Sequence, residues 1–147
     1  MHIVGKVSAI NTSDSVLNLG VYDKDKHGIN LKIEIDAAAG IAIGLVYDFE
    51  YKIVEGERVS YWITSFEAVD SFDIIKKDQT LRSFYPASPI SYEDAKNELE
   101  LYINKIENKI VREITINLIK KYEDKIFVYP AATKMHHAYI GGLAHHF

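Results

Sequence analysis

Residues 29–35 read INLKIEI, and apolar and polar side chains alternate at every position of this segment. In an extended chain a period of two places the four apolar side chains on one face, so the pattern predicts a half-buried β-strand. A polar turn cluster precedes the strand at residues 23–28. Asp36 follows it, where we expect it to cap a short helix over residues 37–39.

Four further segments have the character of strands. Residues 46–54 alternate in the same way, and the hairpin signal at residues 55–57 separates them from a returning strand. A polar turn at residues 11–15 separates the first two segments. The predicted strands cover residues 2–10, 16–22, 29–35, 46–54 and 58–66. Five short strands with a small helix after the third follow the element order of an OB-fold, so we expect a five-stranded OB-like β-barrel.

The chain changes character near residue 75. Beyond a connector that contains Pro86 and Pro89, apolar side chains recur at helical spacing from Ser91, which has the composition and position of an N-cap. Whether Asn108 separates two helices or bends one long helix stays open. We therefore predict an α+β chain with an OB-like β-barrel at residues 1–75, a linker at 76–90 and a helical region at 91–147.

Composition limits the classes of function. The chain of 147 residues is 48% hydrophobic, which suits a globular protein, and its net charge of −4 disfavours tight nonspecific binding to nucleic acid. It contains no cysteine, which excludes disulfides and thiolate metal sites. It shows no signal peptide and no apolar run long enough to span a bilayer. We expect a cytoplasmic protein without a membrane partner.

The C-terminal segment at residues 129–147 carries most of the functional information. It reads YPAATKMHHAYIGGLAHHF and holds four of the six histidines of the chain. The pair Gly141-Gly142 breaks the chain, and residues 143–147 look like the first turn of a helix. An isolated turn is unstable, so the segment is either a frayed tail or part of something longer.

Three strings in this segment are Pro130-Ala131-Ala132, His136-His137-Ala138-Tyr139 and Gly141-Gly142-Leu143-Ala144-x-His146. Together they resemble the entry to the HD domain of YhaM-type 3′–5′ exoribonucleases. Upstream, Ala87-Ser88-Pro89 and Arg112-Glu113-Ile114 look like the connector helices of that family. The resemblance implies an OB-fold followed by helices that open an all-α HD domain, with this chain stopping just inside it.

The resemblance also implies site residues. His146 matches the first metal ligand of HD hydrolases, whereas the later His-Asp pair and final Asp have no counterpart here. His136 and His137 are candidates to support that ligand or orient substrate, and His145 is expected to face solvent. The complete relative would use a divalent, manganese-like metal. One imidazole cannot hold such an ion, so we expect this chain to bind none and to show no nuclease activity alone.

In an OB-like barrel, strands two and three form the ligand face. Here that face carries Tyr22, Lys24, Lys26 and Lys32, which suit single-stranded RNA or DNA, although acidic residues interrupt the patch. The leading hypothesis is the N-terminal part of an exoribonuclease. The alternatives are a non-catalytic nucleic-acid-binding or scaffolding module and an HD phosphohydrolase of small nucleotides. Whether the complete protein is a hydrolase, its preference for RNA or DNA and a homo-oligomeric state stay open.

Overall fold

The computed structural model describes residues 1–131, 134 and 137–146 of the chain. The chain divides into two compact units, Met1–Asp73 and Ile74–Phe147. The boundary falls two residues before the predicted end of the barrel. Each unit has its own buried residues and is described by itself below.

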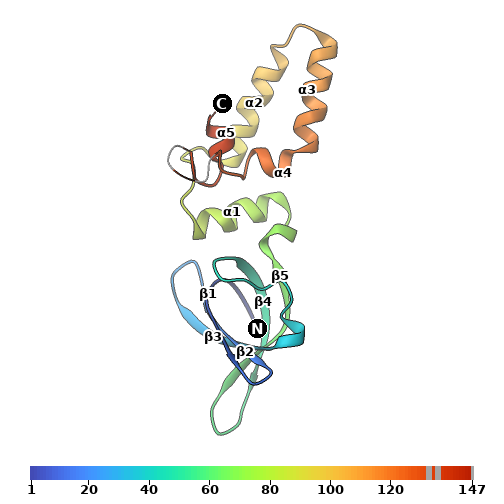
Figure 1. Cartoon of the computed structure of the whole chain (residues 1–147). Helices are drawn as coiled ribbons and strands as arrows, with labels where there is room; N and C mark the ends of the chain where they lie inside the picture. The colour runs from blue at the N-terminus through green and yellow to red at the C-terminus, as the bar shows by residue number, and fades with distance from the viewer. Residues whose placement is uncertain (132–133, 135–136, 147) are drawn as a thin grey trace. The chain divides into compact units, whose positions relative to one another are not determined.

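Five strands close into a barrel in the unit Met1–Asp73 (Figure 1). Around the barrel their order is β1-β2-β3-β5-β4, and β1 pairs with β4 to complete the circle. All neighbours are antiparallel except β3 and β5, which run parallel. The strands are β1 (His2–Ser13), β2 (Val16–Tyr22), β3 (Gly28–Glu34), β4 (Val46–Val54) and β5 (Ser60–Ala68). This arrangement confirms the expected five-stranded OB-like barrel.

The barrel interior is filled by the apolar faces that alternation predicted. Leu19, Leu31 and Phe49 are fully buried, because a period of two sends every second side chain of these strands inward. Tyr47 is also buried, and its hydroxyl donates to the carbonyl of Gly40 at 2.7 Å and accepts the N–H of Ala42 at 2.9 Å. The buried tyrosine thereby satisfies its own hydroxyl and fixes the loop between β3 and β4.

Two local predictions in the barrel need correction. Strand β1 continues to Ser13, so the predicted turn at residues 11–15 shrinks to Asp14 and Ser15, with Asp14 at a φ of 52°. The short helix is a 3-10 turn, η1 (Ile35–Ala37), which contains Asp36 instead of being capped by it. Ile35 is 41% exposed because the turn has already rotated it off the inward face of β3.

The unit Ile74–Phe147 is helical, as expected. Its helices are α1 (Ile74–Phe84), α2 (Tyr92–Asn104), α3 (Lys109–Lys121), α4 (Glu123–Ile126) and α5 (Gly142–His146), and a second 3-10 turn, η2 (Val69–Ser71), precedes them in the barrel unit. Helix α1 occupies much of the predicted linker, so the irregular connection is limited to residues 85–91. The buried residues of α1 are Lys77 and Asp78, and no apolar stripe marks this helix in the sequence.

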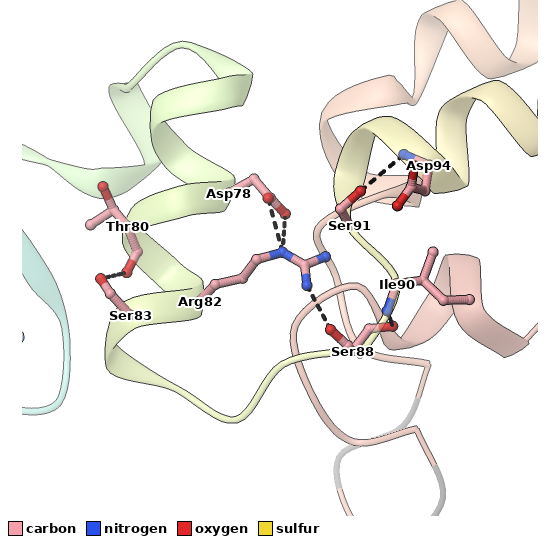
Figure 2. A network of polar contacts seen from close by, with 8 residues as sticks. All are labelled: Asp78, Thr80, Arg82, Ser83, Ser88, Ile90, Ser91 and Asp94. Atoms are coloured by element: carbon pink, nitrogen blue, oxygen red, sulfur yellow. Dashed lines mark hydrogen bonds and ion pairs between the residues drawn. The ribbon is translucent and has the colours of Figure 1, made fainter.

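Capping side chains set the starts of α2 and α3. Ser91 Oγ accepts the N–H of Asp94 at 3.1 Å, as the N-cap pattern predicted (Figure 2). The side chain of Asn108 accepts the N–H groups of Ile110 and Val111, so it begins a new helix and the question left open by the sequence is settled in favour of two helices.

The apolar faces of the helical unit are only partly covered. Phe127 and Val128 are buried, and the ring of Tyr92 meets that of Phe127 edge to face with centroids 5.3 Å apart. On α3, by contrast, Ile114 and Leu118 are exposed. Among the helices that the structure describes, none is long and apolar enough to cross a membrane.

Candidate functional site

The predicted nucleic-acid patch begins at the end of β2. Tyr22 pairs with Lys6 on one side and with Gly28 on the other, and Lys24 and Lys26 lie in the exposed turn that follows. Asp23 organises this turn. Its carboxylate accepts the N–H groups of Asp25 and His27, each at 2.9 Å, and lies 3.2 Å from the His27 ring nitrogen Nδ1.

These contacts fix the negative charge of Asp23 next to Tyr22 and Lys24. The hydrogen bond from the His27 N–H is the main cause that lowers the pKa of Asp23, so the carboxylate stays ionised under ordinary conditions. Ligand atoms of Asp23, Asp25 and His27 all lie within 4.8 Å of one another. The hydrogen bonds of the turn account for this grouping, which therefore indicates no metal site.

Lys32 lies apart from the rest of the predicted patch. Its partner on β2 is Asn18, four positions from Tyr22, a separation of about 13 Å along the strand. On its other side Lys32 pairs with Trp62 of β5, and its Nζ atom lies 5.9 Å from the centre of the tryptophan ring. The structure therefore brings Lys32 together with Trp62 instead of with Tyr22.

Sequence reasoning assigned no role to Trp62. The signal available was its position between Tyr61 and Ile63, which pack against the core, because alternation then turns the tryptophan outward. Beside it, where β3 and β5 begin to diverge, lies an open groove of about 620 Å³. Its polar lining includes Asn30, Lys32 and Arg58.

A histidine cluster forms at the end of the helical unit. The ring of His137 has its centre 5.1 Å from those of His145 and His146. The Tyr139 hydroxyl lies 2.9 Å from His137 Nδ1 and also contacts His145 Nδ1. The prediction that His145 faces solvent is wrong, because this hydroxyl draws the half-buried ring inward. His136 lies outside the described residues.

The Tyr139 hydroxyl constrains the protons of the two rings. A hydroxyl has one hydrogen, so it can donate to only one of the two Nδ1 atoms and must accept the Nδ1–H of the other ring. One histidine of the pair therefore carries its proton on Nδ1. Tyr139 is a further residue of the cluster that the sequence did not single out, since only its contact with both rings gives it a role.

The histidine cluster does not amount to a metal-binding set. Among the described residues, the only three potential ligand atoms that lie within 4.8 Å of one another are those of Asp23, Asp25 and His27, in the barrel. His146 itself is exposed on α5. The described residues therefore do not form a complete site for a divalent metal.

A buried network fixes the backbone that leads to α5. Arg82 Nε donates to both carboxylate oxygens of Asp78, at 2.9 and 3.0 Å, and Nη1 donates to the carbonyl of Ser88 at 2.8 Å (Figure 2). The N–H of Ser88 donates to the carbonyl of Ile140, and the N–H of Gly141 to that of Val128, each at 2.8 Å. These bonds join the connector, the segment that follows α4 and the turn that precedes α5.

The fold thus defines an OB-like barrel joined to a helical unit that carries a histidine cluster. No family model matches the chain. It is 46% identical over 63 residues to the 3′-5′ exoribonuclease YhaM of Geobacillus sp. (strain WCH70), an alignment that covers 43% of this chain and 19% of the relative. The proteins of the same name from Listeria welshimeri and Listeria monocytogenes are 38% identical over 63 residues, with 20% of their length covered.

These relatives confirm the resemblance stated from the sequence, and the chain spans about a fifth of their length. Among solved structures, a replication protein A heterotrimer bound to ssDNA contains a chain that is similar over 56% of this chain and 65% of its own length. The sequence identity is 13% and the TM-score is 0.41.

Proposed function

We propose that this chain is part of a 3′–5′ exoribonuclease in which the barrel binds single-stranded RNA or DNA and the helical unit contributes to a hydrolase site. The observation that carries the proposal is the 46% identity over 63 residues to a protein named for this activity. The barrel supports it independently, because the five-stranded OB-like topology is a common scaffold for single-stranded nucleic acid. A reducing cytoplasm suits the cysteine-free sequence.

Binding by the barrel should be local and weak. The chain carries a net charge of −4, so affinity must come from the few cations on one face and from base stacking. The ionised Asp23 lies between Tyr22 and Lys24 and repels phosphate there. We therefore expect micromolar or weaker affinity for oligouridine, with a shallow dependence on salt.

In the helical unit we propose that His146 supplies one ligand to a divalent, manganese-like metal. The metal would activate water against the terminal phosphodiester in the complete enzyme. Among the described residues, no two further potential ligands lie close to His146, so the remaining ligands must come from other residues. His137 lies against the His146 ring and, held by Tyr139, supports its orientation.

A segment exchange tests the exoribonuclease assignment. The 63 matched residues of Geobacillus YhaM would be replaced by those of this chain, and the release of mononucleotides from single-stranded RNA would be measured with added manganese. Activity close to that of the parent supports the proposal. A folded exchange protein without activity contradicts it, and circular dichroism identifies the folded state.

The second candidate is a non-catalytic nucleic-acid-binding or scaffolding module. The specific observation in its favour is that the described residues of the helical unit hold no three-ligand cluster. We expect the isolated chain to release no mononucleotides with manganese. Release that is lost on His146→Ala would contradict both this expectation and the second candidate. An HD phosphohydrolase of small nucleotides would instead hydrolyse free nucleotides after the same segment exchange.

A further inference from the structure

A row of outward-facing side chains crosses the whole barrel at one level. Cross-strand partners lie on the same face of a sheet, so the pairings of the five strands place these side chains side by side. Trp62 pairs with Lys32 of β3 and with Lys52 of β4. The row, from β1 through β2, β3 and β5 to β4, consists of Asn11, Asn18, Lys32, Trp62 and Lys52. It holds amides, ammonium groups and one indole, and no carboxylate.

Trp62 is not needed by the core. Its neighbours Tyr61 and Ile63 pack against the buried cluster, whereas Trp62 points to the other side of the strand and is half-buried among the side chains of the row. Its Nε1–H donates to Ser60 Oγ at 3.1 Å, which fixes the rotation of the ring. An indole held in one orientation on an outer face is a ready platform for stacking a planar group.

The cations beside Trp62 are available to an anion. Lys52 and Arg58 form no ion pair with any residue in the described ranges, and Lys32 forms none either but lies over the Trp62 ring. Arg58 and Lys32 both line the groove at the diverging ends of β3 and β5. Positive charge therefore flanks the indole along the row and at its groove side.

We propose that single-stranded nucleic acid binds along this row, with one base stacked on Trp62 and its phosphates held by Lys32, Lys52 and Arg58. The proposal rests on the proposed function of the barrel and assigns the principal contact to β5 instead of to Tyr22. A single strand is required, because a base can lie flat on an indole only when it is unstacked from its neighbours.

Trp62 is the only tryptophan of the chain, which makes the platform directly observable. The full chain would be titrated with oligouridine at low salt, and indole fluorescence and the anisotropy of a labelled oligonucleotide would be followed in parallel. Stacking should quench the indole with the same midpoint as the anisotropy change. Trp62→Leu should weaken binding about ten-fold or more, and Trp62→Tyr should retain most of it.

Two matched comparisons separate stacking from charge and from folding. With three contacted phosphates, log affinity should fall with log salt at a slope of about −2. Lys52→Ala should make this slope shallower by about 0.7. Tyr22→Ala, which alters the other end of the β2–β3 hairpin, should bind as the unaltered chain does. Thermal unfolding of each variant verifies that the barrel has formed.

The outcomes distinguish the two proposals. Two results together would overturn the Trp62 platform: binding detected by anisotropy without a change in indole fluorescence, and unaltered affinity of folded Trp62→Leu. Nucleic-acid binding by the barrel would then stay intact. Loss of binding in Tyr22→Ala alone would move the contact to the end of β2. No binding by any variant at low salt would overturn the proposed function of the barrel and this inference with it.

Discussion

The guanidinium of Arg82 fills the space that a side chain on Gly141 would need: its Nη2 atom lies 2.8 Å from the position of a Cβ on that glycine. Gly141 also has a φ of 75°, a conformation that L side chains rarely adopt. The same arginine pairs with buried Asp78 and binds the Ser88 carbonyl. One side chain therefore ties α1 and the connector to the turn in front of α5.

Gly141→Ala should destabilise the helical unit by about 1–3 kcal/mol, because alanine meets both the backbone strain and the guanidinium. Gly40→Ala is the matched control. Gly40 has a φ of 90° but nothing within 4 Å of its Cβ position, so only strain acts there. Urea unfolding monitored by circular dichroism measures both. A loss of stability in Gly141→Ala no larger than in Gly40→Ala would show that Arg82 moves aside at no cost.

Arg82→Met should cost about 3–5 kcal/mol, since it leaves the Asp78 carboxylate buried without its partner. The double variant Asp78→Leu with Arg82→Met should recover much of that loss, because it removes the buried carboxylate that Arg82→Met leaves without its partner. Ser83→Ala removes a hydrogen bond on the exposed side of the same helix and should change stability by less than about 0.5 kcal/mol (Figure 2). A double variant no more stable than Arg82→Met would contradict the buried-charge explanation.

The bridge between α2 and α4 should make the stability of the helical unit depend on pH. Lys96 Nζ lies 2.7 Å from Glu123 Oε1, and Tyr92 donates to the same oxygen at 3.0 Å. The hydrogen bond from Lys96 lowers the pKa of Glu123 below its ordinary 4.5, so this contribution is complete above about pH 4.5 and is lost as the pH falls through the folded-state pKa. Hydrogen bonding to Glu123 raises the pKa of Lys96 above 10.5, and that contribution is lost as the pH rises through the raised value.

Glu123→Gln should therefore reduce stability at neutral pH and flatten the acid limb of the profile. The effect should stay below about 1 kcal/mol, because both side chains are about a third exposed or more and water screens the pair. Burial is the main cause that raises the pKa of Tyr92. Ionisation of Tyr92 therefore adds to the loss of stability above pH 10, and this contribution should persist in Glu123→Gln. Unfolding midpoints across the pH range test this. Parallel profiles for the two proteins would exclude Glu123 as the titrating group.

The barrel should fold without the helical unit, since residues 1–73 close all strand edges and contain their own core. Within that fragment, Phe49→Ala should cost about 3–5 kcal/mol because the ring is fully buried. Ile53→Ala, on the same strand but 44% exposed, should cost far less. Dispersed amide signals and the two unfolding midpoints are the measurements. A poorly dispersed spectrum of the fragment would contradict its independent folding.

The alternation of apolar and polar side chains was sufficient to predict the strands of the barrel. The side-chain pattern of a half-buried strand repeats every two residues, whatever the strand pairs with. Helix α1 was not recognised for the opposite reason. Its buried residues are Lys77 and Asp78, which are held inside by the Tyr129 ring and by Arg82, and such contacts cannot be read from the helix itself. A helix that buries charges shows no apolar stripe.

The candidate sites, like the fold, were predictable only where the local sequence decides the structure. The histidine-rich segment could be located by composition, yet the proximity of Tyr139 to His137 and His145 depends on a turn that the sequence does not specify. Trp62 was overlooked because its neighbours are set by strand order. Lys32 becomes adjacent only when β5 enters the sheet beside β3, a pairing between residues 30 positions apart.

That pairing also bears on how the chain acquires its fold. The parallel junction of β3 and β5 has two residue pairs, Leu31 with Tyr61 and Lys32 with Trp62, whereas the β2–β3 hairpin has seven. Hairpins close short loops and form early, while a short contact across a long loop recovers its entropic cost only once the rest is in place. We therefore expect the junction of β3 and β5 to close late in folding, and the fluorescence of Trp62, which lies in it, to follow that step during refolding.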